Sequence, residues 1–367
     1  MAVFRTDEVQ DADLEIASLE QASSISGNLL AFFTATVAVF IVSYVISHFG
    51  TVSWLDLVIG FTAAVSLPLM LFMSVVLKPV RSTMVRFSKR KPLAAVGAII
   101  LILAVTTDVY ADYLAPHDPE AVGVAKCEAD GQTSRKFCGP GAEGAPLGTD
   151  NIGRDILSRL IHGARISMYV GLMTVLVGIT IGTVIGIGSA YWGGVSDMVV
   201  QRLVDALMGF PPIILALGLM AALGASINNV VIALVVILVP GATRVIRSEA
   251  LRIKELDYIL ASRAIGANPS RVMIRHIMPN VIATYIVLMT ITLGFAIVVE
   301  ASLSFLGVGV PEGTPTWGGM LNIGRKYMEQ QAWLVVFPGI AIAAVVFAVN
   351  FLGDGLRDVL DPRLRGR

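Results

Sequence analysis

Long apolar stretches separated by short polar segments dominate the chain. A helix that crosses a bilayer needs roughly 20 mostly apolar residues, because no water is present there to satisfy its backbone. Eight stretches meet this requirement, at about 29–49, 55–77, 93–115, 166–190, 198–223, 226–243, 281–305 and 332–353. The pattern therefore predicts an all-α, polytopic protein whose helices span a membrane.

Proline interrupts two of these stretches without changing the prediction. The second contains Pro68, and the fifth contains Pro211 and Pro212. Membrane helices tolerate proline because neighbouring groups can satisfy the freed carbonyls. We therefore count 55–77 and 198–223 each as one span.

Composition agrees with a membrane protein. The chain is 55% hydrophobic and 15% charged, and its mean hydropathy is +0.77. A soluble domain of this length could not keep so much apolar surface inside one core. The formal net charge is zero, so no overall excess of charge would attract nucleic acid.

The distribution of Lys and Arg predicts the orientation. These residues concentrate in cytosolic loops, and most of the 27 fall on the cytosolic side if the amino terminus is inside. The acidic start, residues 1–28, is the opposite of the basic region that opens a secretory signal. We expect a retained cytosolic tail, both termini in the cytosol, and a location in the inner (plasma) membrane.

Polar segments divide the chain further. Two outer segments, 116–165 and 306–331, flank a cytosolic segment at 244–280. The predicted organisation is an acidic tail (1–28), a transmembrane hairpin (29–77), a first core span with its outer segment (78–165) and a core domain (166–367). Cys127 and Cys138 lie in the first outer segment, where oxidising conditions would allow a disulfide, although two such cysteines can equally stay reduced.

The cytosolic segment predicts two short helices at about 249–279. The first ends near Ile265, and Gly266 supplies a left-handed stop. Asn268 can cap the second helix, Pro269 suits its first position, and Pro279 marks where it cannot continue undisturbed. A compact Gly266-Ala267 tip would separate the two helices, and an ordinary amphipathic loop also fits these features.

This segment resembles the coupling motif of ABC-importer permeases, written EAA, three residues, Gly and later Pro. The matching residues are Leu260-Ala261-Ser262, Gly266 and Met278-Pro279, with Leu260 and Ser262 departing from the motif. Five more segments resemble the second permease subunit of the dipeptide, oligopeptide and nickel branch: YLAPHDP (113–119), LGTDNIGRDILSRLIHGARISMYVGL (147–172), AYWGGVSDMVVQRLVDALMGFPPIILAL (190–217), EASLSFLGVGVPEGTPTWGGML (300–321) and FLGDGLRDVLDPRLRG (351–366). The resemblance covers roughly 93–367, and the hairpin 29–77 departs from the family, which usually has one helix before the outer loop.

The resemblance implies a type I permease core of about six spans that imports peptides. It implies four kinds of partner: a second homologous permease in a heterodimer, two cytosolic ATPase subunits, an external solute-binding protein and the peptide. The chain has no GxxxxGK[ST] phosphate loop, so ATP would be bound by the partners and this subunit would be neither an enzyme nor a cofactor carrier. The residues expected to couple to the ATPases are Ala261, Ser262, Arg263, Gly266, Ala267, Arg271 and Pro279.

Glu300 is the acidic residue that the pattern places well inside a span. A charge at the bilayer centre costs about 2.5–3.5 kcal/mol on insertion scales. Two roles are open for Glu300: a structural hydrogen bond, or a contact to the amine of a passing peptide. The four histidines show no metal-binding spacing.

Other classes of function fit less well. A secondary transporter would favour several acidic groups inside spans, and a membrane-embedded enzyme would need convergent catalytic groups at one depth. Nickel chelates and glutathione-like peptides are alternative cargoes for the same architecture.

Overall fold

The computed structural model describes residues 91–129, 132–311 and 313–360. They all belong to one compact unit of the chain, which comprises residues 78–367. The predicted tail 1–28 and hairpin 29–77 lie outside the described residues.

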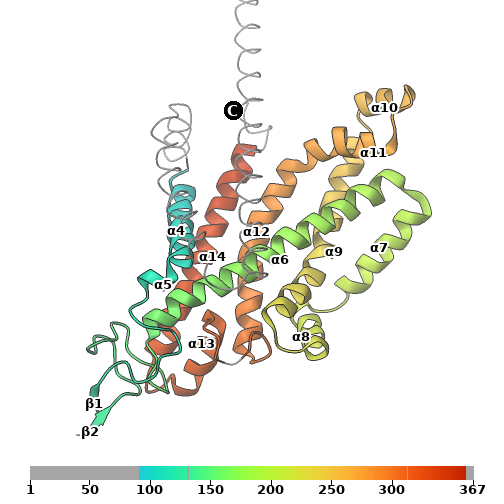
Figure 1. The fold of residues 1–367 in the computed structure, drawn as a ribbon. Coiled ribbons are helices and arrows are strands. Elements are labelled where there is room, and N and C mark those ends of the chain that lie inside the picture. The colour runs from blue at the N-terminus through green and yellow to red at the C-terminus, as the bar shows by residue number, and fades with distance from the viewer. Residues whose placement is uncertain (1–90, 130–131, 312, 361–367) are drawn as a thin grey trace, which may run out of the picture. The chain divides into compact units, whose positions relative to one another are not determined.

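Helices make up almost all of this unit (Figure 1). In chain order they are α4 (Pro92–Val109), α5 (Ala111–Leu114), α6 (Ile156–Trp192), α7 (Gly194–Met208), α8 (Pro212–Leu223), α9 (Ile227–Lys254), α10 (Asp257–Ala264), α11 (Pro269–Val272), a π-helical turn (Met273–Ile277), α12 (Met278–Phe305), α13 (Trp317–Gly324), a 3-10 turn (Arg325–Tyr327) and α14 (Trp333–Leu360). A small antiparallel hairpin of β1 (Cys127–Ala129) and β2 (Gln132–Ser134) lies between α5 and α6. The prediction of an all-α polytopic core is confirmed.

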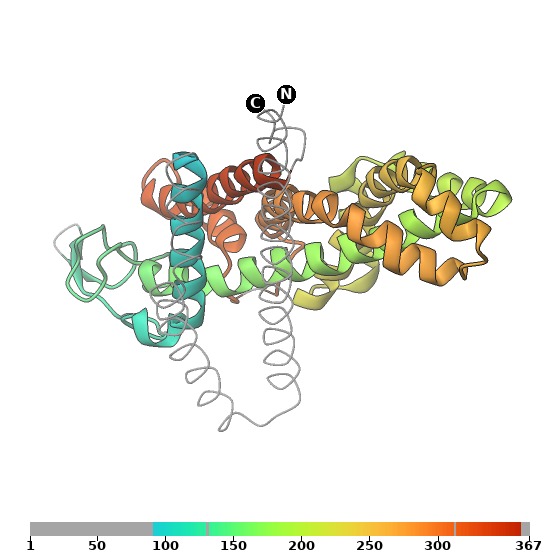
Figure 2. The ribbon, with the colours of Figure 1, turned by 90° about the horizontal axis from the view of Figure 1, so that it is seen from above.

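Among the described residues, five helices are long and apolar enough to cross a membrane, or six if α7 and α8 count as one bent span. That number agrees with the predicted core of about six. Helix α6, with 37 residues, extends from the end of the unit that carries β1 and β2 to the end that carries α10 (Figures 1 and 2). It packs against α4, α9 and α12.

The predicted span 198–223 is not one continuous helix, because α7 and α8 meet at a 90° bend. Pro211 occupies the N-cap of α8 and Pro212 its first turn. Neither proline has an N–H to continue the hydrogen bonding of α7, and the ring of each obstructs the carbonyl one turn earlier. Proline suits the start of the new helix, where no N–H is needed.

Two helices are longer than the hydrophobic pattern indicated. The N-terminal end of α6 is at Ile156 rather than near 166, because the Asp155 side chain accepts hydrogen bonds from the N–H groups of Leu157 and Ser158. Helix α9 continues to Lys254 instead of ending near 243. Polar residues end an apolar stretch, but they do not by themselves end a helix.

Helices α6 and α9 cross in close contact over a row of glycines on α6. A Cβ atom added at Gly182 would lie 2.6 Å from the Cβ of Ala242, and one added at Gly186 would lie 2.8 Å from the carbonyl oxygen of Thr243. Small residues spaced four apart let helix backbones approach each other in a membrane. Because of this contact α6 and α9 form one packed unit, which we call the α6–α9 block.

The segment between α5 and α6 has its own small core. Cys127 and Cys138 form a disulfide bond, and Ala125 and Ala145 are buried with them. Gly148 has a φ of +87°, and a Cβ there would lie 2.4 Å from the carbonyl oxygen of Cys138. Glycine is therefore required where this segment folds back on itself.

Candidate functional site

The chain between α9 and α12 forms a bent projection, which we call the elbow and define as residues 257–277. Helix α10 ends in a Schellman motif: the N–H of Ala267 donates to the carbonyl of Ser262 at 3.1 Å, and that of Gly266 to Arg263 at 3.0 Å. Gly266 has a φ of +82°. Asn268 then caps α11 by accepting a hydrogen bond from the N–H of Ser270 at 3.1 Å. The structure thus has the left-handed stop and the cap that the sequence predicts.

The second helix of the elbow is not short, and this part of the prediction is wrong. Residues Pro269–Phe305 form one continuous helical segment that includes α12. Pro279 lies in the first turn of α12, directly after the π-helical turn of Met273–Ile277. A π turn changes the helical hydrogen-bonding pattern, and this irregularity is where the proline is accommodated without ending the helix.

The inner face of the elbow is anchored to the α6–α9 block. Ile259, Val272 and Ile277 are fully buried. They form one apolar cluster with Ile187 and Ala190 of α6 and with Ile246, Ala250 and Ile253 of α9. Each buried isoleucine side chain contributes about 1.5–3 kcal/mol. The elbow is therefore firmly attached to the ends of two long helices.

The outer face of the elbow exposes several large apolar side chains. Ile265 is 86% exposed and Ile274 71%, and Tyr258 and Leu260 are also exposed. A group of large exposed apolar side chains marks an interaction surface. Tyr258, Ile265 and Ile274 are not among the predicted coupling residues; the signal that could have found them is their apolar character close to a turn that the local chemistry predicts.

The predicted coupling residues divide between the two faces. Ala261, Arg263, Gly266, Arg271 and Pro279 are exposed. The other two, Ser262 and Ala267, are half-buried: the Ser262 hydroxyl lies 3.5 Å from His276 Nε2, and Ala267 packs against the apolar cluster. Among the described residues, no atom lies within 4 Å of a Cβ built on Gly266, so this part of the chain leaves the tip uncovered.

A second feature is an apolar groove between α6 and α9. Its lining is Tyr169, Met173, Val177, Asn228, Val231, Ile232, Val235 and Val236. The Tyr169 hydroxyl donates to the Asn228 side-chain oxygen at 3.4 Å. None of the described residues that line this groove is charged, so it suits an apolar surface or side chain.

Glu300 lies in the interior and does not line the groove. Its side chain is fully buried, and one carboxyl oxygen accepts a hydrogen bond from the Ser304 hydroxyl at 2.9 Å. Ser167 of α6, which is also buried, is a second hydrogen-bonding neighbour of the carboxyl group. Helix α13 packs tightly beside it, since a Cβ on Gly318 would lie 2.5 Å from the Ala301 carbonyl oxygen.

We expect Glu300→Gln to retain transport and Glu300→Leu to lower thermal stability. Glutamine keeps an oxygen that accepts from Ser304, whereas leucine leaves that buried hydroxyl without its partner, at a cost of about 1–3 kcal/mol. Thermal unfolding in detergent and peptide uptake in liposomes measure the two effects. Ser302→Ala is the control, because the Ser302 hydroxyl bonds within its own helix to Val298. A Glu300→Gln variant of normal stability that no longer transports would favour a contact with cargo instead.

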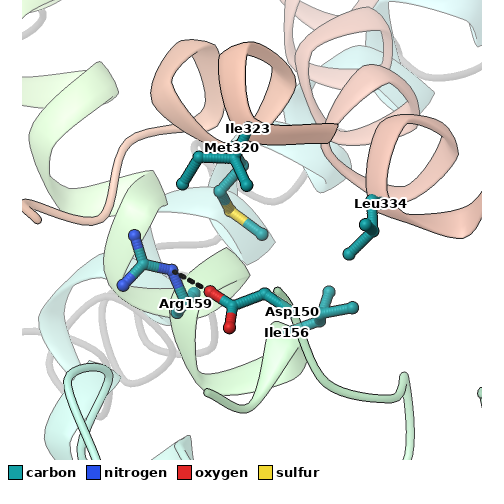
Figure 3. A pocket seen from close by; sticks show the side chains of 6 residues that line it. All are labelled: Asp150, Ile156, Arg159, Met320, Ile323 and Leu334. Carbon is teal, nitrogen blue, oxygen red and sulfur yellow. Dashed lines mark ion pairs between the residues drawn. The ribbon is translucent and has the colours of Figure 1, made fainter. Parts of the chain in front are cut away.

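The opposite end of the unit is organised around buried charges, shown in Figure 3. The Asp150 carboxylate accepts from Arg154 Nε at 2.7 Å and lies 4.0 Å from Arg159 Nε. Arg159 also donates to the carbonyl of Pro119 at 3.0 Å. Met320 and Ile323 of α13 and Leu334 of α14 line the small pocket beside the Asp150 and Arg159 side chains. These contacts join the segment before α6 to α13 and α14.

No group of three or more His, Cys, Asp or Glu side chains in the described part of the chain is placed to hold a metal ion.

Comparison with known proteins places this architecture in a family. Residues 178–366 match the model of the binding-protein-dependent transport system inner membrane component. A Brucella suis protein named as a peptide transport system permease is 40% identical over 287 residues, 78% of this chain and 93% of that protein. A glutathione transport system permease protein of Pectobacterium atrosepticum is 38% identical, covering 76% of this chain and 90% of that protein. A dipeptide transport system permease protein of Alkalihalophilus pseudofirmus is 37% identical, covering 76% and 88%.

These matches confirm the predicted resemblance to ABC-importer permeases, and they cover almost the whole length of the relatives. The matched region includes the elbow, the α9 side of the groove and both helices of the bent pair. The chain therefore belongs to the family of binding-protein-dependent transport system inner membrane components, the membrane permeases of ABC importers.

Proposed function

We propose that this permease imports di- and oligopeptides and that its elbow docks on a partner ATPase. The observation that carries the proposal is the construction of the elbow: an exposed apolar face and an open glycine tip, backed by side chains buried against α6 and α9. A force applied at the tip would move both long helices as a block. Rigid-body movement of packed elements is a general way to transmit such a switch.

The orientation and partners follow from the same proposal. The elbow lies on the cytosolic side, with both termini, because the basic segments 78–91 and 244–275 favour that side. Two ATPase subunits bind and hydrolyse ATP, and this chain has no catalytic role. A second permease completes the pathway, and an external binding protein delivers cargo to the end that carries β1 and β2.

The groove between α6 and α9 supports a position for the pathway. The groove lies between two long membrane-spanning helices and has an apolar lining with a Tyr169–Asn228 pair. Peptides with apolar side chains suit this lining. The names of the relatives, which refer to peptides, dipeptides and glutathione, support a peptide cargo.

Glutathione-like peptides are a second candidate cargo, because a relative named for glutathione transport is 38% identical to this chain. A nickel chelate is the remaining alternative within the branch that the sequence resembles.

The complete importer, reconstituted in liposomes with its binding protein, tests the proposal. We expect ATP hydrolysis and uptake to be stimulated by di- or oligopeptides, and to be unaffected by a nickel chelate. Stimulation by glutathione alone would assign the second candidate. Peptide movement driven by an ion gradient through this chain without any other subunit would contradict the proposal.

A further inference from the structure

Two ion pairs connect α7 to α9. Arg247 of α9 donates two hydrogen bonds to Asp197 of α7, from Nε to Oδ1 at 2.7 Å and from Nη2 to Oδ2 at 2.5 Å. A bidentate pair fixes the orientation of both side chains as well as their distance. The second pair joins Arg244 to Asp205.

The two pairs differ in their surroundings. The Arg247 and Asp197 side chains are 27% and 16% exposed, whereas those of Arg244 and Asp205 are 51% and 47% exposed. Water screens exposed ion pairs, so they contribute little to stability, whereas partly buried pairs are screened less. The Asp197–Arg247 pair is thus the stronger attachment.

Helix α7 has bends at both ends. Gly193 and Gly194, with φ values of +65° and +58°, separate it from α6. At the other end, a 90° bend separates it from α8. Val204 is the buried residue of α7 in the described structure, so apolar packing within this chain holds α7 only weakly. Its position on α9 therefore depends strongly on the ion pairs.

Arg247 is located directly behind the elbow. Its neighbours along α9, Ile246 and Ala250, belong to the apolar cluster that anchors the elbow. A Cβ built on Gly186 of α6 would lie 3.1 Å from the Arg247 backbone nitrogen. Seven residues further on, Lys254 Nζ donates to the carbonyl of Ala190 at 3.0 Å and so attaches the end of α9 to the end of α6. The guanidinium is thus carried by the block to which the elbow is attached.

We propose that Arg247 is a positioning residue that makes α7 follow the elbow during transport. When the elbow and the α6–α9 block move, the two hydrogen bonds between Arg247 and Asp197 make α7 move with them. Without these hydrogen bonds, the backbone bends at Gly193–Gly194 and α7 does not move with the block. This inference rests on the proposed docking of the elbow on an ATPase, and it assigns the route by which the movement reaches the bent α7–α8 pair.

The complete importer in liposomes tests this assignment through the amount of peptide transported per ATP hydrolysed. We expect Arg247→Gln and Asp197→Asn to lower that ratio about fivefold or more, the size of a typical coupling between sites, while the ATPase subunits stay bound. Arg247→Lys and the exchanged pair Asp197→Arg with Arg247→Asp should each recover at least half of the wild-type ratio, because they restore opposite charges across α7 and α9.

Arg252→Gln is the matched control. Arg252 makes an equally close pair with Glu249, 2.5 Å between Nη2 and Oε1, but both residues lie on α9. Its loss should leave the ratio unchanged, because that pair joins no second element. A normal ratio in Arg247→Gln would overturn the inference, and so would a lowered ratio that neither the lysine variant nor the exchanged pair restores. Absence of ATPase subunits from the purified wild-type complex would instead contradict the proposed docking.

Discussion

Replacing Gly266 with leucine should leave the protein folded in the membrane but unable to retain its ATPase partners. Gly266 has a φ of +82°, and nothing in the described chain lies within 4 Å of a Cβ at this position. A side chain there costs about 1–2 kcal/mol in backbone conformation, too little to unfold the anchored elbow. It would nevertheless fill the space that a docked partner needs, so ATPase co-purification and peptide transport should both be lost.

Two further variants separate backbone strain from contact with the partner. Gly266→Asn keeps a residue type that tolerates the left-handed region, so it should also lose the ATPases if the tip approaches them closely. Gly224→Leu is the matched control: Gly224 has a φ of +83°, equally open space, and a position at the end of α8 away from the elbow. It should retain the ATPases. Normal co-purification with Gly266→Leu would mean that the ATPase docks elsewhere.

Replacing Asp150 with alanine should destabilise the protein by about 3–5 kcal/mol, the cost of breaking a buried ion pair by removing one partner. Asp150 and both of its arginine neighbours are buried. Its carboxylate also accepts the N–H groups of Ile152 and Arg154, at 3.0 and 2.9 Å. Alanine would leave two buried guanidinium groups and two backbone donors without this acceptor. A large fall in the midpoint of thermal unfolding in detergent is expected.

Asp118→Ala serves as the control for this measurement. Asp118 also accepts a backbone N–H, that of Glu120 at 2.7 Å, but it is exposed and has no arginine partner within the described ranges. Its loss should shift the midpoint only slightly, because water replaces the lost bond. Equal shifts for the two variants would show that the buried charges around Asp150 contribute little to stability.

The relation between sequence and structure differs from one feature to another. The tip of the elbow was predictable, because a left-handed glycine, a capping asparagine and a proline at the first helical position act within a few residues of one another. The extent of α9 was not predictable from the sequence, because the helix continues past the apolar stretch to Lys254, where it packs against α6. The length of the helix that contains Pro279 was also not predictable, because the preceding π turn accommodates the proline inside a longer helix.

The roles of individual polar residues depended even more on the tertiary structure. Glu300 was recognisable as unusual, but its burial beside Ser304 and α13 depends on how three helices meet. The pairing of Asp197 with Arg247 joins residues 50 positions apart, and no local pattern indicates which of the many arginines would be chosen.

By itself, the sequence determined that this is a helical membrane protein of a permease type, roughly where the apolar stretches of its core lie and how the tip of the elbow turns. Hydrophobicity and backbone stereochemistry act locally, so both can be read along the chain. Only the tertiary structure decided which helices end, bend or continue, which charges are buried together, and which face of the elbow is left open. Those outcomes depend on packing and pairing between segments that are distant in the chain, which local composition does not encode.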